Sequence, residues 1–444
     1  MKIYTVSLGC PKNLVDTEIM LGNLTREGWE VVDDPRAASL LLVNTCAFIA
    51  PASQEAVDAI LELARYKEND SGKLLAVTGC LVQRYGPDLE QLLPEVDLFV
   101  GVHDFPQLPH LLRQLGEGRG RRLWHHARPY DYREPQPRLA ATPRHLAYLK
   151  IAEGCSHACT FCVIPRIRGP YRSRPLDTLI HEALDLAAQG VKELILVAQD
   201  TTAYSRDGGG RPGLPDLLRE LGRLPGFTWL RVLYSHPARI TRELVETMAA
   251  LPQVAPYLDL PIQHGHDEML RRMGRGYNRA KVIEACRLIR EVLPQAALRT
   301  SVMVGFPGET EDHFQALLDL VQEVRFHHLG VFLYSPEEGA PAAKFAGAPP
   351  RRVVRRRAQR LKALQARIVK ERLKALVGAR QPVLVEGVSP ESEYLLSGRL
   401  ITQAPDIDGQ VYITAGEGRV GEVQMVKITR ALAYDLVGEI VTAD

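Results

Sequence analysis

The chain has 444 residues, of which 45% are hydrophobic and 24% charged, and its net charge is +2. This composition is ordinary for a soluble globular protein with two or three domains. No apolar run is long enough to span a membrane, and the first residues lack the pattern of a signal peptide. We therefore expect a cytoplasmic protein with no membrane partner, in which seven cysteines favour metal or redox chemistry over disulfides.

Residues 1–125 alternate between apolar strand patterns and amphipathic helical patterns. Strands are expected at residues 2–7, 40–44, 73–78 and 96–100, and helices over residues 14–27 and 53–66. This alternation predicts an N-terminal α/β domain whose parallel sheet is covered on both faces.

One cysteine follows each of the first three expected strands, namely Cys10, Cys46 and Cys80. Because the carboxyl ends of parallel strands share one edge of a sheet, where ligands bind, we expect the three thiols to meet there. Three unrelated buried cysteines are the alternative. The repeated position favours three ligands of an iron–sulfur cluster that leaves one iron open.

Residues 126–143 are rich in proline, from Pro129 to Pro143, which is typical of a linker or an irregular bridge between domains. His126 is the first residue of this stretch, and His125 directly precedes it. We expect these two histidines to be exposed rather than to bind a metal.

A second set of thiols falls within eight residues, namely Cys155, Cys159 and Cys162. The C-x₃-C-x₂-C spacing follows an expected strand at residues 145–152, so the thiols lie on a loop after a strand. Three such thiolates can hold three irons of a cubane cluster and leave the fourth open. A structural zinc site is the alternative, but it needs a fourth ligand from His157 or from a distant residue. Phe161 would supply an apolar wall beside the loop, and we expect it to contact the cofactor.

Six strands, each except the last followed by a helical pattern, are expected within residues 144–349. The strands are expected at residues 145–152, 193–198, 228–234, 257–261, 298–304 and 328–334, and the helices at 177–189, 214–223, 242–250, 279–293 and 311–324. Six parallel strands predict an incomplete (βα)₆ barrel, whose site lies at the carboxyl-terminal rim.

Polar residues follow several of these strands, and from their place at the rim we expect four of them to bind a cofactor, namely Gln199, Ser235, Gln263 and Arg275. The alternative for Gln199 is a role in capping a loop. His264 and His266 could bind zinc, but the sequence offers no third ligand at a suitable spacing.

Basic charge is concentrated near the end of the chain. Residues 350–380 hold twelve basic residues and one acidic residue, a net +11, in a pattern that predicts a basic helix over 350–378. This density suggests contact with phosphate groups. Residues 379–444 form short strand patterns separated by glycine turns, which predict a small all-β barrel of the oligonucleotide-binding type. From residue 380 onward, ten acidic and five basic residues give −5.

The cysteine loop, with Phe161 before its last thiol, resembles the radical S-adenosylmethionine (SAM) family. The whole chain resembles the methylthiotransferases. It shares their order of parts: an α/β domain with three dispersed cysteines, then a radical SAM barrel, then a terminal barrel that resembles the TRAM domain. Three stretches are similar to the branch that modifies an aspartate of the small-subunit ribosomal protein S twelve (uS12): residues 257–264, 332–340 and 403–413.

The resemblance implies two 4Fe–4S clusters and SAM as cofactors, together with an electron donor as partner. It implies that the cluster on Cys155, Cys159 and Cys162 reduces SAM to a 5′-deoxyadenosyl radical, which removes a hydrogen from the β-carbon of the target aspartate. The cluster on the three dispersed thiols would carry the sulfur, which a second SAM methylates.

Two alternatives remain. The tRNA-modifying methylthiotransferases, which act on adenosine, share the clusters and the architecture. A non-catalytic iron–sulfur protein for electron transfer or sensing would not need a barrel with a polar rim. The acidic terminal barrel favours a basic ribosomal protein over tRNA, although the basic helix could contact ribosomal RNA.

Overall fold

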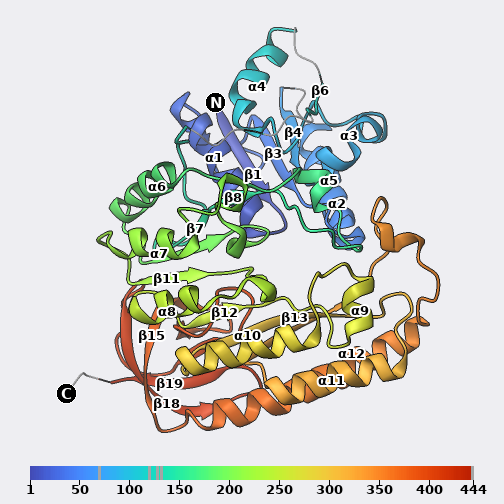
Figure 1. Ribbon diagram of the computed structural model, residues 1–444. Coiled ribbons are helices and arrows are strands. Elements are labelled where there is room, and N and C mark those ends of the chain that lie inside the picture. The colour runs from blue at the N-terminus through green and yellow to red at the C-terminus, as the bar shows by residue number, and fades with distance from the viewer. Residues whose placement is uncertain (69–71, 119–121, 127–129, 131–133, 442–444) are drawn as a thin grey trace.

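The computed structural model describes residues 1–68, 72–118, 122–126, 130 and 134–441. In chain order it forms an N-terminal α/β domain, a central half-barrel and a C-terminal β-barrel (Figure 1). Within these residues, no helix combines the length and apolar character needed to cross a bilayer. Pro129 of the expected linker lies outside the described residues.

The N-terminal domain contains one parallel sheet with the strand order β2-β1-β3-β4-β5-β6. Its strands are β1 (Lys2–Ser7), β2 (Glu30–Val31), β3 (Leu40–Thr45), β4 (Leu74–Gly79), β5 (Leu98–Val100) and β6 (Leu123–Trp124). Its helices are α1 (Pro11–Arg26), α2 (Ala50–Glu68), α3 (Cys80–Leu92) and α4 (Leu108–Gly116), and a short 3₁₀ turn, η1 (Phe105–Gln107), precedes α4.

Strand β3 shows why this sheet is covered on both faces. All six of its residues are buried. Leu40 and Leu42 pack in one hydrophobic cluster, whereas Leu41 and Val43 pack in another, as the alternation of side chains along a strand requires.

The parallel sheet confirms the predicted fold class of this domain, but it has two strands more than expected. Strands β2 and β6 have two residues each, too few to produce a periodic pattern in the sequence. The backbone N–H of Gly101 donates to the carbonyl of Trp124 at 2.7 Å, so residues just before the expected linker are part of the sheet.

The described residues 134–143 of the proline-rich stretch form a fixed bridge. The buried Arg138 donates to the carboxylates of Glu18 on α1 and Glu182 in the central barrel. The backbone N–H of Leu139 donates to the carbonyl of Glu18 at 3.0 Å. His125 and His126 are exposed, as predicted.

The six predicted strands of the central domain are present and parallel, in two sheets with the orders β7-β10-β11 and β12-β13-β14. They are β7 (Leu146–Lys150), β10 (Glu193–Val197), β11 (Trp229–Val232), β12 (Tyr257–Asp259), β13 (Ala297–Val304) and β14 (His328–Leu333). An isolated parallel bridge pairs Leu230 with Val254 between the sheets. The incomplete (βα)₆ barrel is therefore confirmed, with a break between β11 and β12.

Five helices pack against this half-barrel as predicted, namely α6 (Leu176–Ala188), α7 (Leu214–Gly222), α8 (Arg242–Ala250), α10 (Arg279–Val292) and α11 (Glu311–Val324). Two shorter helices, α5 (Ile164–Arg168) and α9 (Asp267–Arg272), lie near the rim. A ribbon of two antiparallel strands, β8 (Ala152–Glu153) and β9 (Arg172–Ser173), supports the second cysteine loop at its base.

The predicted basic helix is α12 (Arg351–Lys374), which lies beside α11 (Figure 1) and also contacts β14. Leu361, Leu364 and Ile368 form its buried stripe. Arg357 is the only arginine of α12 that is buried. Its guanidinium donates to Glu309 Oε1 at 2.6 Å. Most of its other basic side chains are exposed.

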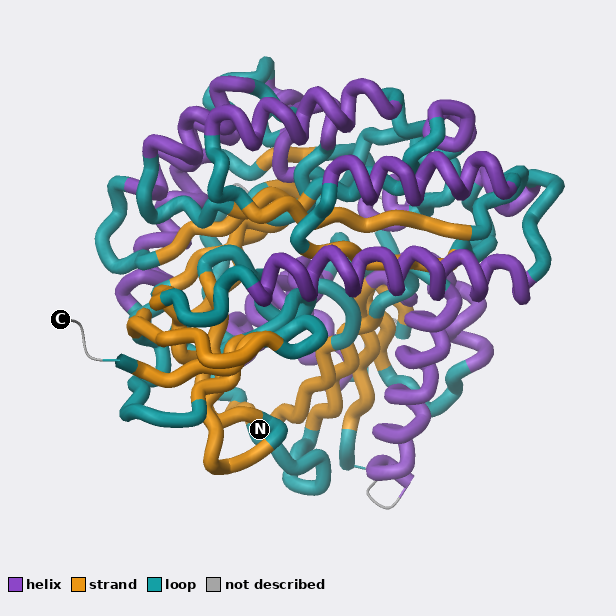
Figure 2. The backbone as a smooth tube through the Cα atoms, turned by 90° about the horizontal axis from the view of Figure 1, so that it is seen from below, coloured by secondary structure: helices purple, strands orange, loops and turns teal. Residues whose placement is uncertain are grey.

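The C-terminal part is a closed five-stranded barrel with the order β15-β16-β17-β19-β18 (Figure 2). The strands are β15 (Arg380–Ser389), β16 (Ser392–Leu400), β17 (Val411–Ile413), β18 (Val423–Ala431) and β19 (Leu436–Ile440). Alternate residues such as Val383, Val385 and Ile413 fill its core. The prediction of a small all-β barrel is confirmed.

The C-terminal barrel docks against the amino-terminal ends of the half-barrel strands. Arg399 of β16 donates to Glu193, the first residue of β10, at 2.6 Å, and Arg231 of β11 donates to the same carboxylate at 2.6 Å. The Tyr257 hydroxyl, at the start of β12, lies 2.6 Å from Asp408 Oδ2. The N-terminal domain lies on the β7 side of the half-barrel, where α1 contacts β7 and α3 contacts α5 (Figure 1).

We expect Glu193→Ala to destabilise the protein strongly, because it leaves two buried guanidinium groups without their shared carboxylate. Removing one partner of a buried ion pair costs about 3–5 kcal/mol of unfolding free energy. A urea titration followed by circular dichroism measures the change. Glu284→Ala, which removes an exposed partner of Lys281, is the matched control and should leave the midpoint unchanged. Equal midpoints for the two variants would contradict the assigned role of Glu193.

Candidate active site

The three dispersed thiols meet at one edge of the N-terminal sheet. Cys10 precedes α1, Cys46 follows β3, and Cys80 opens α3. A Cβ atom built on Gly9 would lie 2.6 Å from Cys46 Cβ, so only glycine, here with φ +96°, lets these two loops approach so closely. The structure thus brings together the residues that the strand-end pattern placed on one edge.

Asn13 of α1 ties the three loops to one another. Its side-chain amide donates to the carbonyl of Leu8 at 3.0 Å and to that of Thr45 at 2.8 Å. Its Oδ1 atom lies 3.8 Å from Cys80 Sγ. One buried side chain therefore fixes all three strand ends.

Two cations face this first thiol set, and the sequence analysis did not identify either of them. Burial raises the pKa of the Cys10 thiol, but Lys12 and Arg168 outweigh that effect and lower it overall. Burial raises the pKa of Cys80 to about 12, against the opposing charge of Arg168. Lys12 is two residues from Cys10 and was recognisable in the sequence, whereas Arg168 comes from the central domain.

The second cysteine loop leaves β8 through Gly154, which has φ +78°. A Cβ atom there would lie 2.2 Å from the carbonyl oxygen of Pro170. The loop is then held by backbone bonds, among them those from Cys155 N–H to Gly169 O at 3.0 Å and from Thr160 N–H to Met273 O at 3.0 Å. Its three thiols are therefore presented at the carboxyl-terminal rim on a constrained backbone.

Arg275 reaches the second thiol set directly. Its guanidinium donates to Cys159 Sγ at 3.1 Å and to the carbonyl of Pro261 at 3.0 Å. Its Nε–H donates to the Tyr277 hydroxyl at 3.0 Å. The structure therefore places this predicted cofactor-binding residue against a thiol.

The other predicted cofactor contacts lie around the same rim. Gln199 donates to Glu153 Oε1 at 2.9 Å and keeps a buried Oε1 atom with no partner in the described chain. Ser235 is buried after β11, and Gln263 has φ +66° and forms a bridge with Val302. Phe161 packs beside the apolar cluster that contains Phe306, in keeping with the predicted wall.

His157, the nearest candidate for a fourth zinc ligand, is engaged elsewhere. Its Nε2 atom lies 2.7 Å from Asp200 Oδ2, and Arg239 also donates to that carboxylate. Its ring stacks on His236 with a centroid distance of 4.3 Å. Burial, with Arg275 and His157 adding to it, lowers the pKa of His236 to about 3, so this ring is neutral at neutral pH.

The thiol spacing also discriminates between zinc and a cluster. Tetrahedral zinc with Zn–S bonds of about 2.3 Å holds its sulfurs roughly 3.8 Å apart. In the described chain, neither set of three cysteines has all its sulfurs within 4.8 Å of one another. Each iron of a cubane has its own cysteine, so a cluster needs the wider spacing.

The structure groups His266 with two potential metal ligands other than His264, with which the sequence analysis had paired it. His266, Glu268 and His313 place one ligand atom each within 4.8 Å, because the first turn of α11 lies beside the start of α9. However, Nδ1 of His266 accepts the N–H of Glu268, and Nδ1 of His313 accepts that of Thr310. Because each Nδ1 atom accepts a hydrogen bond, the single proton of each neutral ring is on Nε2. A metal ion could bind Nε2 only if that proton moved to Nδ1, and the move would break both helix caps.

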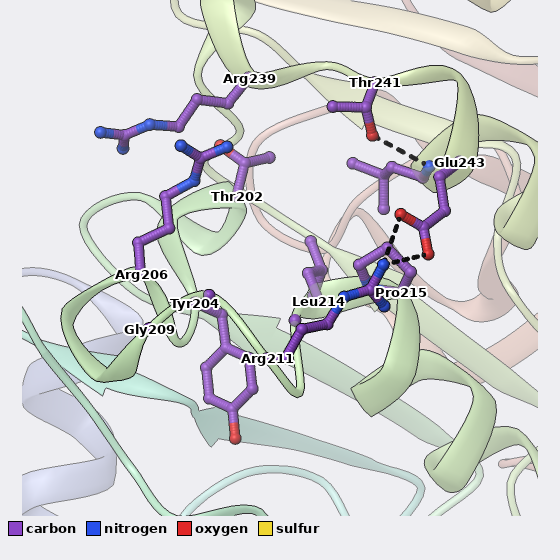
Figure 3. Close-up of a pocket in the computed structure, with 13 residues that line it drawn as sticks. Thr202, Tyr204, Arg206, Gly209, Arg211, Leu214, Pro215, Arg239, Thr241 and Glu243 are labelled. Atoms are coloured by element: carbon purple, nitrogen blue, oxygen red, sulfur yellow. Dashed lines mark hydrogen bonds and ion pairs between the residues drawn. The ribbon is translucent and has the colours of Figure 1, made fainter.

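A cavity of about 530 Å³ lies outside the rim, between the loop after β10 and the first turns of α7 and α8 (Figure 3). Arg206 and Arg239 extend toward one another on one side, while Arg211 pairs with Glu243 on the other. A smaller cavity of about 200 Å³ shares Arg206 and Arg239 and reaches Ser156 and His157 of the cysteine loop.

Three family models match successive parts of the chain: "Uncharacterized protein family UPF0004" over residues 2–101, "Radical SAM superfamily" over 149–321 and "TRAM domain" over 377–441. Among curated relatives, the "Ribosomal protein uS12 methylthiotransferase RimO" of Geobacter sulfurreducens is 48% identical over 99% of both chains. That of Myxococcus xanthus is 47% identical over 99% of this chain and 91% of its own.

The chain belongs to the RimO family of radical SAM methylthiotransferases. The fold also resembles that of a radical SAM methyltransferase, TsrM, from Kitasatospora setae, with a TM-score of 0.59, 18% identity and coverage of 86% of this chain and 78% of that chain. The cobalamin-dependent radical enzyme OxsB gives a TM-score of 0.57 at 14% identity, covering 77% and 54%.

Membership of the RimO family implies SAM and 4Fe–4S clusters as cofactors, and the residues present fit them. All six cysteines of the two sets are free thiols. Each set offers three sulfurs that do not all lie within 4.8 Å of one another, which suits a cubane in which each iron has its own cysteine. Guanidinium donors lie against one sulfur of each set, as is suitable for thiolate ligands.

Proposed function

We propose that this RimO-family enzyme methylthiolates the β-carbon of an aspartate in ribosomal protein uS12. The observation that carries the proposal is the presence of two sets of three thiols on facing edges of two domains, joined by one buried network of side chains. The names of the curated relatives supply the substrate. The proposal extends to two 4Fe–4S clusters and two SAM molecules in each turnover.

Cys155, Cys159 and Cys162 would hold the cluster that binds SAM, and Cys10, Cys46 and Cys80 would hold the sulfur-carrying one. When bound, the clusters and SAM supply a carbon-centred radical and a methylated sulfur, neither of which protein side chains can supply.

Phe161, Gln199, Ser235, Gln263 and Arg275 remain our proposed SAM contacts. The free Oε1 atom of Gln199 supports its assignment, because a buried acceptor without a partner needs a ligand or water.

The contact between the domains would keep water away from both thiol sets. Lys150 and Arg168 of the central domain pair with Asp16 of α1 and with Glu153, and all four side chains are buried. Two positive and two negative charges balance, which offsets the cost of burying them. This polar contact would also keep the two edges at a constant separation, as positioning of two reacting groups requires.

The substrate test is a direct comparison. Protein reconstituted anaerobically with iron and sulfide is given SAM, dithionite and either uS12 or adenosine-containing tRNA, and mass spectrometry follows the gain of one methylthio group. We expect the gain on uS12 alone. Methylthiolation of tRNA with unmodified uS12 would replace our proposal by its tRNA alternative, and 5′-deoxyadenosine formation would exclude a non-catalytic iron–sulfur protein.

We further propose contact between α12 and ribosomal RNA, a physiological electron donor as partner, and a cytoplasmic location. The RNA contact is supported by exposed basic side chains of α12 that form no ion pair in the described chain, among them Arg351, Arg352, Arg355, Arg356 and Lys362. Phosphate contacts make binding depend on salt.

For the double variant Arg355→Ala/Arg356→Ala we expect weaker binding to small-subunit ribosomal RNA. The slope of log affinity against log salt concentration should fall by roughly 2, since each lost phosphate contact removes about one. Filter binding at several salt concentrations measures the slope. The matched control, Arg26→Ala/Arg65→Ala, removes two exposed arginines from the N-terminal domain and should leave the slope unchanged. Identical slopes for both double variants would refute the contact through α12.

A further inference from the structure

Each set of thiols receives a hydrogen bond from one arginine of the central domain. Arg275 donates to Cys159 Sγ at 3.1 Å, and Arg168 donates to Cys80 Sγ at 3.4 Å. Arg168 is the less expected of the two, because it follows the second cysteine loop in sequence and yet contacts the first thiol set.

We propose that Arg168 is a positioning residue that sets the reduction potential of the sulfur-carrying cluster and joins that cluster to the loop of the SAM-binding one. This inference rests on the proposed function, which places a cluster on Cys10, Cys46 and Cys80.

Both terminal nitrogens of the Arg168 guanidinium are in use. Nη2 donates to Cys80 Sγ and to Asn13 Oδ1, and Nη1 donates to Glu153 Oε2 at 2.7 Å and to Asp16 Oδ2 at 3.2 Å. The side chain is 2% exposed. A guanidinium stays charged even in such a site, so this one is a permanent positive charge in a fixed orientation beside a sulfur.

The position of Arg168 is fixed from the other thiol set. Helix α5 starts directly after Val163, and the N–H of Ile164 lies 3.4 Å from Cys162 Sγ. The helix has five residues, which rise roughly 7.5 Å, and its last residue is Arg168. Helix α5 lies beside α3, the helix that Cys80 opens (Figure 1). One short rigid element therefore has a thiol of one set at its start and contacts a thiol of the other set at its end.

Hydrogen bonds to sulfur and nearby charge are the means by which a protein adjusts the potential of an iron–sulfur cluster. Reduction adds a negative charge, which a positive donor stabilises, so Arg168 should raise the potential. Lys150 gives a matched comparison, because it is fully buried in the same network, where its ammonium group contacts the carboxylates of Asp16 and Glu153.

The test uses the full chain with Cys155, Cys159 and Cys162 changed to alanine, so that only the first thiol set can hold a cluster. After anaerobic reconstitution, iron and sulfide are counted, and a dithionite titration followed by electron paramagnetic resonance gives the midpoint potential. Three further variants in this background are compared with it, namely Arg168→Gln, Arg168→Lys and Lys150→Met.

We expect Arg168→Gln to keep the cluster with a more negative midpoint potential, Arg168→Lys to fall between it and the parent, and Lys150→Met to match the parent. If glutamine prevents cluster assembly, the lysine variant alone must still show the negative shift. An unchanged midpoint in the Arg168 variants, or an equal shift in Lys150→Met, would overturn the role of Arg168. A parent that binds no iron would instead overturn the cluster assignment in the proposed function.

Discussion

Cys159→Ala should reduce the formation of 5′-deoxyadenosine from SAM to the level of a protein-free reaction. Three thiolates are the fewest that can hold a cubane cluster and leave one iron open, so two are insufficient. The change also leaves the buried Arg275 guanidinium without its sulfur partner. Anaerobic incubation with SAM and dithionite, followed by chromatography of the nucleoside, measures the effect.

Cys286→Ala is the control for this substitution. Cys286 is a buried thiol on α10 within the hydrophobic core, where a cysteine behaves as a small apolar side chain. The control variant should cleave SAM at the parental rate. Nucleoside formation by Cys159→Ala above the protein-free level would mean that the second cysteine loop does not hold the cluster.

Cys46→Ala should separate the two halves of the reaction. The second cysteine loop and its contacts with Met273, Gly169 and Arg275 remain, so SAM cleavage is expected to continue. The first set retains only two thiols, and we expect no methylthiolated uS12 by mass spectrometry. Persistent product at the parental level would show that the sulfur does not come from a cluster on the N-terminal domain.

Local patterns in the sequence predicted the two parallel units well. Strand β3 is a continuous apolar run because both of its faces are buried, and such a run is recognisable without a structure. The meeting of Cys10, Cys46 and Cys80 followed from topology, because the ends of parallel strands share an edge. Strands β2 and β6 could not be predicted, because each has only two residues. Such a strand forms by pairing with its neighbour in the sheet and has no hydrophobic pattern of its own.

Contacts between residues that lie far apart in the chain could not be predicted from the sequence. Nothing near Arg168 indicates that it would reach Cys80, 88 residues earlier in the chain. The same holds for His313, which approaches His266 only because two helices begin side by side. Arg275 was expected to bind a cofactor from its place at the rim, but its contact with Cys159 depends on how the segment after α9 folds back over the cysteine loop.

The docking of the C-terminal barrel at the amino-terminal ends of the strands sets a length scale for recognition. Strand β7, which precedes the second cysteine loop, has five residues and β13, the longest half-barrel strand, has eight, which at about 3.3 Å per residue is a length of roughly 17–26 Å. An extended peptide needs roughly five to eight residues beyond the rim to reach the barrel. A small folded domain, about 30 Å across, spans that distance, so one folded target can enter the rim and contact the barrel at the same time.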